Sequence, residues 1–104
     1  MKRLLLVLCL GLFAAIVSEY KLHQNFPNPF NPETTIEVEL AEDGPAILTV
    51  YDILGQAVAK PFAGNFTRGR YSVLFSGRDL PSGVYVYQLE AGAFVDQKKM
   101  VLLK

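Results

Sequence analysis

Residues 34–40, TTIEVEL, decide the fold class of this 104-residue chain. Three apolar side chains, Ile36, Val38 and Leu40, alternate with polar ones, so successive side chains point to opposite faces of an extended backbone. An antiparallel sheet that packs one face on a core and leaves the other in water shows this pattern. The segment therefore predicts a half-buried β-strand.

Segments of the same kind occur on both sides of it, separated by Gly, Pro, Asn and Asp. No part of the chain after residue 18 shows a sustained helical period of 3.6 residues. Strands spaced in this way predict an all-β fold, an immunoglobulin-like antiparallel β-sandwich of about seven strands. We expect Pro61 to end the fourth strand, and the expected strands are 21–24, 34–40, 46–51, 57–62, 70–75, 84–91 and 94–103.

A local signature supports the sandwich. The segment LPSGVY, residues 80–85, is similar to the tyrosine corner of immunoglobulin-like domains, in which a tyrosine hydroxyl bonds to backbone a few residues upstream. We expect the Tyr85 hydroxyl to meet the backbone near Leu80. The alternative is that Tyr85 is an ordinary core aromatic.

The first eighteen residues have the pattern of a signal peptide. Lys2 and Arg3 precede the unbroken apolar run Leu4–Val17, which is shorter than the roughly 20 residues of a membrane-spanning helix. We expect cleavage after Ser18 and a mature domain over residues 19–104, with an uncleaved N-terminal anchor as the alternative. The only cysteine, Cys9, lies in the leader, so the mature chain has no disulfide.

The charge distribution argues against nucleic acid as a partner. Residues 19–104 carry eight basic and ten acidic residues, a net charge of −2, whereas nucleic-acid binding requires a strongly basic face. Residues 19–52 carry −6 and residues 53–104 carry +4. We therefore expect cross-strand pairs between the acidic strand at Glu37 and Glu39 and basic positions such as Arg70.

No catalytic constellation is present. His23 is the only histidine, which leaves two-histidine metal sites and a histidine-based triad without a second member. Glu37 and Glu39 are interpreted as a solvated strand face, not as a general acid and base. We expect no catalytic residues, no metal and no cofactor, and hence no enzyme.

Four motifs in order resemble one family: NFPNPFNPETTI (25–36), VYDILG (50–55), LPSGVY (80–85) and KKMVLLK (98–104). Together they look like the C-terminal sorting domain of type IX secretion cargo. A related immunoglobulin-like module of flagellar hook-capping proteins shares part of the pattern. The residues that carry the resemblance, to which we assign a structural role, are Pro27, Asn28, Pro29, Phe30, Asn31, Pro32, Asp52, Gly55, Leu80, Gly83 and Tyr85.

The resemblance implies a non-enzymatic, immunoglobulin-like module that directs secretion. It implies transit through the periplasm, recognition by an outer-membrane secretion translocon, and removal by a cell-surface protease of sortase-like action. The product is then at the cell surface or extracellular, and we expect a monomer that meets the membrane only during export. By resemblance, recognition is assigned to Lys98, Lys99 and Lys104. The alternative is that these lysines protect a strand edge from aggregation.

The sequence departs from the family pattern in one respect. Such domains normally follow a long cargo, whereas here the leader and the domain are nearly adjacent. The domain is then itself the product, or a remnant or fragment that has lost its cargo. The alternative function is a free-standing secreted binding or structural module, in adhesion or glycan contact, that uses Tyr51, Tyr85 and Tyr87.

Overall fold

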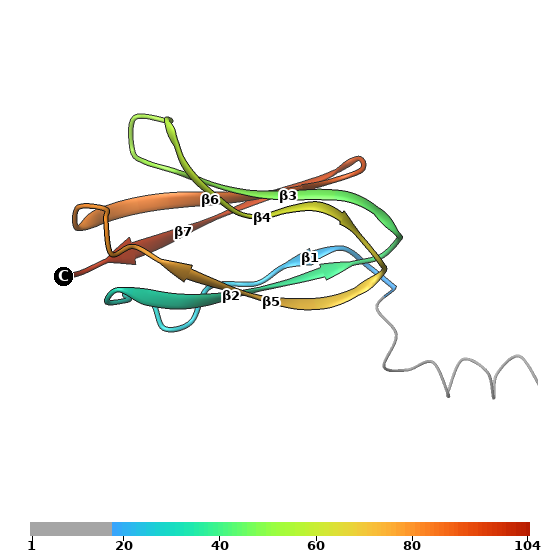
Figure 1. Ribbon diagram of the computed structural model, residues 1–104, viewed down its shortest axis with the longest axis horizontal. Coiled ribbons are helices and arrows are strands. Elements are labelled where there is room, and N and C mark those ends of the chain that lie inside the picture. Colours follow the sequence, from blue (N-terminus) through green and yellow to red (C-terminus); the bar gives the residue numbers. More distant parts are fainter. Residues whose placement is uncertain (1–17) are drawn as a thin grey trace, which may run out of the picture.

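Two antiparallel β-sheets pack face to face in the computed structural model, which describes residues 18–104 (Figure 1). One sheet has three strands in the order β1-β2-β5, and the other has four in the order β4-β3-β6-β7. The predicted all-β sandwich is confirmed. The strands of the described residues are β1 (Lys21–Leu22), β2 (Glu33–Leu40), β3 (Gly44–Tyr51), β4 (Ala57–Phe66), β5 (Gly69–Ser76), β6 (Gly83–Ala91) and β7 (Phe94–Leu102).

The predicted signal peptide, residues 1–18, lies outside the described residues except for Ser18. Its cleavage, and the domain boundary at that position, therefore stay predictions. Within residues 18–104, no helix is long and apolar enough to cross a membrane.

The core lies between the two sheets, and the alternating pattern of the strands supplies it. Ile36, Val38 and Leu40 of β2 are at most 1% exposed, and Leu48 and Val50 of β3 are fully buried. Burying an aliphatic side chain of this size contributes about 1.5–3 kcal/mol, so each of these five residues stabilises the fold. The other buried apolar residues are Leu22, Phe30, Ala46, Val73, Phe75, Tyr85, Tyr87, Leu89, Ala91, Met100 and Leu102.

Strand β4 is longer than predicted, because it continues through Pro61 to Phe66. The expectation that Pro61 ends the strand is wrong for a physical reason. Proline lacks an N–H group, but an edge strand or a β-bulge tolerates that loss. β4 is an edge strand. Leu48 of β3 faces Phe62, but Val50 faces Ala59, so the register shifts at the position of Pro61.

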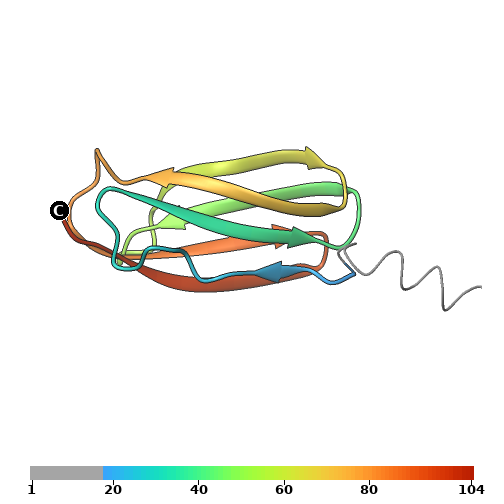
Figure 2. The same cartoon turned by 90° about the horizontal axis from the view of Figure 1, so that it is seen from below.

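Edge strands of different sheets are neighbours in space: β1 contacts β7, and β4 contacts β5 (Figure 2). The chain between β1 and β2, residues 23–32, contains the proline-rich motif. Because it leaves β1 beside β7, this motif runs next to the C-terminal strand, far from it in sequence.

The predicted cross-strand charge pair between β2 and β5 is confirmed. Glu39 faces Arg70 in the register, and Arg70 Nη2 lies 3.6 Å from Glu39 Oε1. The His23 ring also donates a hydrogen bond to Glu39 Oε2. This bond holds the pKa of the Glu39 carboxyl below its ordinary value, against the opposing effect of burial and with help from the charges of Arg70 and Lys21.

Candidate recognition surface

The tyrosine corner predicted before β6 is present. The Tyr85 hydroxyl donates to the Pro81 carbonyl oxygen at 2.6 Å, one residue beyond Leu80. The Leu80 N–H donates to the Gly77 carbonyl at 3.0 Å, which tightens the turn, and Gly83 begins β6. Burial, with a contribution from the Asp52 carboxylate, raises the pKa of the Tyr85 hydroxyl.

A second tyrosine, Tyr87, fixes the segment that leads into β2. Its side chain is fully buried, and its hydroxyl donates to the His23 carbonyl at 2.7 Å and accepts the Asn25 N–H at 2.8 Å. Burial raises the pKa of Tyr87 to about 12. Its partners lie 64 and 62 residues away in the chain and leave no local signal.

The buried side chain of Asn25 closes the proline-rich loop on itself. Its Nδ2 donates to the Pro27 carbonyl and to Thr34 Oγ1, both at 3.0 Å, and the Thr34 hydroxyl donates to the same carbonyl at 2.8 Å. Asn25 Oδ1 accepts a bond from Gln24 at 2.7 Å. Among the described residues every buried side-chain polar atom has a partner, so this loop is fixed by satisfied bonds.

The same loop covers the outer edge of β7. Asn28 Oδ1 accepts the Val101 N–H at 2.9 Å. The Phe30 N–H donates to the Val101 carbonyl at 2.9 Å, and the Leu103 N–H donates to the Phe30 carbonyl at 3.0 Å. An edge strand normally presents unpaired backbone groups that can recruit another strand. Here the motif residues Asn28 and Phe30 satisfy the N–H and carbonyl of Val101 and the N–H of Leu103.

Pro29, Asn31 and Pro32, the other residues of the proline-rich motif, lie on either side of Phe30 in the chain. The Pro32 carbonyl accepts the Gly77 N–H at 2.7 Å, which ties the loop to the end of β5. Pro29 and Asn31 are exposed. The Phe30 ring is 1% exposed and packs edge-on against Phe75 at a centroid distance of 6.1 Å. The motif thus anchors its loop in the core through one aromatic ring.

The three lysines to which recognition is assigned do not form one cluster. Lys98 faces the buried Tyr87 in the register and is half-buried, so it belongs to the inner side of β7. Lys99 is exposed on the outer side, where its partner is Val86, while its carbonyl accepts a bond from Gln24 at 2.7 Å. Lys104 donates to the Arg78 carbonyl. Lys99 is therefore the member of the set that lies on the open face of the sheet.

The turn between β3 and β4 displays two apolar side chains. Asp52 Oδ1 accepts the N–H groups of Leu54 and Gln56, both at 2.9 Å, and Gly55 adopts a φ of 83° that other residues rarely adopt. Ile53 and Leu54 are 77% and 79% exposed at its tip. The motif residues Asp52 and Gly55 thus build a fixed turn that holds two large apolar groups in water.

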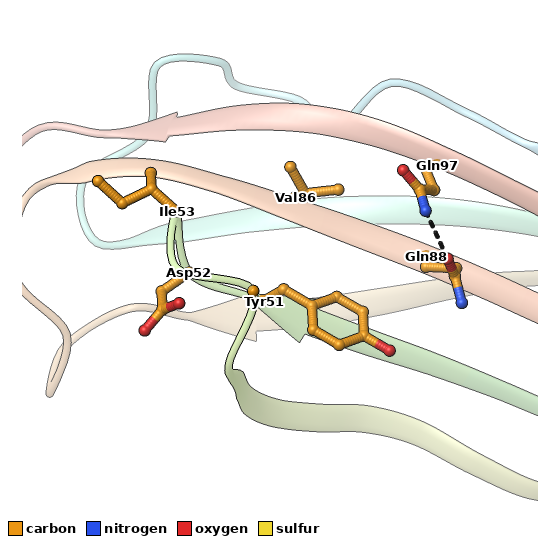
Figure 3. A pocket seen from close by; sticks show the side chains of 7 residues that line it. Tyr51, Asp52, Ile53, Val86, Gln88 and Gln97 are labelled. Carbon is orange, nitrogen blue, oxygen red and sulfur yellow. Dashed lines mark hydrogen bonds between the residues drawn. The ribbon is translucent and has the colours of Figure 1, made fainter.

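A shallow hollow lies on the sheet beside this turn, with a volume of about 350 Å³ (Figure 3). Tyr51, Ile53 and Val86 contribute apolar walls, and Gln97 Nε2 donates to Gln88 Oε1 at 2.6 Å across two strands. Because Lys99 is the register partner of Val86, its side chain leaves the sheet next to this hollow. Lys99, the exposed Ile53–Leu54 tip and the hollow thus lie at the same end of the four-stranded sheet.

The geometry does not support the tyrosine patch of the alternative function. Tyr85 and Tyr87 are 3% and 0% exposed, and Tyr51 is half-buried, so the three do not form an exposed aromatic surface. Residues 18–104 contain no group of three or more His, Cys, Asp or Glu side chains arranged to hold a metal ion.

These features define an immunoglobulin-like β-sandwich in which the proline-rich loop is hydrogen-bonded to the outer edge of the C-terminal strand β7. The family model for the secretion system C-terminal sorting domain matches residues 24–103, which include strands β2 to β7 and leave out the short strand β1. The chain belongs to this family, which confirms the resemblance drawn from the four motifs.

A solved structure shows the same fold. It is that of PorZ, described as an essential bacterial surface component of the type IX secretion system of Porphyromonas gingivalis, with a TM-score of 0.54 and 15% identity. The match covers 80% of this chain and 11% of that chain, so the chain is similar to one small part of PorZ. None of the curated proteins matches the sequence significantly.

Proposed function

We propose that this chain is a non-enzymatic sorting module that directs export across the outer membrane by a type IX-like system. The observation that carries the proposal is the family match over residues 24–103, which covers almost the whole sandwich. The family motifs also hold the fold and its C-terminal edge. The proposal includes passage through the periplasm, an outer-membrane translocon and a sortase-like protease as partners, and a final place at the cell surface or outside.

Within this proposal, the partner recognises the solvent-exposed face of the four-stranded sheet, near the end of the sheet where β7 finishes. Lys99 supplies the charge there, and the Ile53–Leu54 tip and Val86 supply apolar area. A contiguous exposed apolar patch is a feature of protein-binding surfaces, and Ile53 and Leu54 are adjacent exposed apolar residues. Lys98 and Lys104 are the other residues to which we assign recognition, and their half-buried or bonded positions support a smaller contribution.

Secretion of a reporter tests the proposal. A signal peptide and a reporter placed before residues 19–104, in a bacterium with a type IX system, should deliver the reporter outside the cell. A reporter that stays in the periplasm contradicts the proposed function.

A matched pair of charge reversals then tests the surface. Lys99→Glu should reduce export, whereas Lys60→Glu, at an exposed position on β4 at the other edge of the same sheet, should not. Thermal unfolding of both variants separates a recognition defect from a folding defect. Equal export by two equally stable variants contradicts the assignment to Lys99.

A further inference from the structure

The outer face of the three-stranded sheet carries a second feature, on the opposite side of the sandwich from Lys99. Phe26 and Thr35 pair through two backbone hydrogen bonds of 2.9 and 3.0 Å, and Thr35 faces Leu74 in the register. The backbone of Phe26 is therefore fixed, yet its side chain is 80% exposed, and Leu74 is 65% exposed. Two large apolar side chains thus stand in water on either side of a threonine.

A carboxylate without an ion pair lies next to this row. Glu39 is engaged by His23 and Arg70, but no ion pair among the described residues involves Glu37, which faces Ser72. Glu37 lies two residues from Thr35 on the same face of β2, and so diagonally across from Phe26. Diagonal neighbours on one face of an antiparallel pair are about 7–8 Å apart, within reach of one long side chain.

A hollow of about 370 Å³ joins these groups, lined by His23, Gln24, Phe26, Thr35 and Glu37. The His23 ring donates to Glu39 and does not compete for Glu37. The Gln24 amide nitrogen is committed to Asn25 and to the Lys99 carbonyl, which leaves its Oε1 as an acceptor. The hollow therefore combines an aromatic wall with a carboxylate and a second hydrogen-bond acceptor.

We propose that this hollow binds the side chain of an arginine on a partner protein. A guanidinium group is planar, stacks on an aromatic face, and donates two parallel hydrogen bonds to a carboxylate. Phe26 supplies the face and Glu37 the carboxylate. Leu74 does not line the hollow but lies beside Thr35 at its border, where it offers an apolar surface to the methylene stem. Lysine fits less well, because its ammonium group neither stacks nor bonds in a bidentate manner. The site is independent of the sorting function and lies on the other sheet.

A titration followed by NMR tests this site with the purified protein. The probe is the peptide acetyl-Gly-Arg-Gly-amide, and its matched control replaces arginine by citrulline, which has a similar shape but no charge. The arginine peptide should shift the backbone amides of Gln24, Phe26, Thr35 and Glu37 in a saturable way. Shifts of equal size with the citrulline peptide, or no saturable shifts at these amides, would overturn the proposal.

Two variants identify the groups responsible, and a third is the matched control. Glu37→Gln should weaken binding about tenfold, the loss expected for a hydrogen bond to a charged group. Phe26→Leu keeps an apolar side chain at this exposed position and should weaken binding by removing the ring. Glu90→Gln changes the net charge equally but lies exposed on β6 of the other sheet, and it should bind like the unchanged protein. Equal losses in the two glutamate variants would indicate non-specific attraction and refute the site.

Discussion

Replacing Tyr87 by phenylalanine removes one oxygen atom and tests how the N-terminal loop is held. The hydroxyl lies in a fully buried side chain, donates to the His23 carbonyl and accepts the Asn25 N–H. The phenylalanine ring fits the same space, so the core packing is conserved. The variant therefore isolates the two hydrogen bonds.

The expected loss of stability follows from the burial of the two partners. Asn25 is 2% exposed, so its N–H stays without a partner, at a cost of about 1–3 kcal/mol. The carbonyl belongs to His23, which is half-buried and accessible to water, so it adds less. We expect Y87F to lose about 2–3 kcal/mol of unfolding free energy. A domain of this size has roughly 4–13 kcal/mol in total, so the loss is large.

Urea denaturation at neutral pH measures this loss, and the chain supplies matched controls. Tyr51→Phe removes the same atom from a half-buried tyrosine for which the structure shows no hydrogen bond, and we expect a change below about 0.5 kcal/mol. Tyr85→Phe removes one bond, to the Pro81 carbonyl, and should give an intermediate loss of about 0.5–1.5 kcal/mol. If Y87F and Y51F were equally stable, the hydroxyl would not hold the loop.

The raised pKa of Tyr87 provides an independent test of the burial of its hydroxyl. Burial raises it from 10.0 to about 12, so the neutral hydroxyl stabilises the fold below pH 10. This stabilisation is lost as the pH rises through about 12. The difference in unfolding free energy between the unchanged protein and Y87F should therefore shrink between pH 10 and pH 12. A difference that stays constant over this range contradicts the assigned cause.

Three further changes have defined outcomes. Glu39→Gln should lower the free energy of unfolding, measured by urea denaturation, by about 1 kcal/mol at pH 7. Because the fold lowers the pKa of the Glu39 carboxyl from 4.5, the difference between the unchanged protein and the variant should vanish as the pH falls through the lowered value. A difference that does not change with pH refutes this prediction. Gly77→Ala places a Cβ 2.7 Å from Leu102 Cδ2 and should lower the free energy of unfolding by about 1–3 kcal/mol, as measured by thermal unfolding. Leu102→Val in the same chain should recover part of this loss. If the losses of the two single variants simply add in the double variant, the predicted clash is contradicted. Asn28→Ala should speed hydrogen exchange of the Val101 amide, and unchanged exchange contradicts the cap.

Local patterns were sufficient to predict one cross-strand pair and the strands, apart from the ends of β1 and β4. The alternation of residues 34–40 gave the buried face of β2, because side-chain direction in a strand depends only on residue parity. The tyrosine corner was predictable since the Tyr85 hydroxyl and the Pro81 carbonyl are four residues apart. The pairing of Glu39 with Arg70 followed from opposite charge on facing strands.

The remaining features depend on contacts between distant segments. Nothing near Pro61 indicates that its strand lies at a sheet edge, where the missing N–H is tolerated. Likewise, the bond from Val101 to Asn28 spans 73 residues, and it forms only because β1 brings the loop beside β7. The surface positions of Lys98 and Lys99 also depend on the register with β6, which no local pattern fixes.

The capped edge limits how a secretion partner can recognise the C-terminal strand. The outward backbone groups of Lys99, Val101 and Leu103 are already bonded to residues 24–30, so a partner cannot add a strand there without displacing the loop. Under the proposed function, recognition then uses side chains on the outer face. The proline-rich motif and the terminal strand therefore form one structural unit, although they lie near opposite ends of the domain in sequence. Truncating the C-terminus removes bonds to the loop together with the lysines, whereas a charge reversal at Lys99 alters the surface alone.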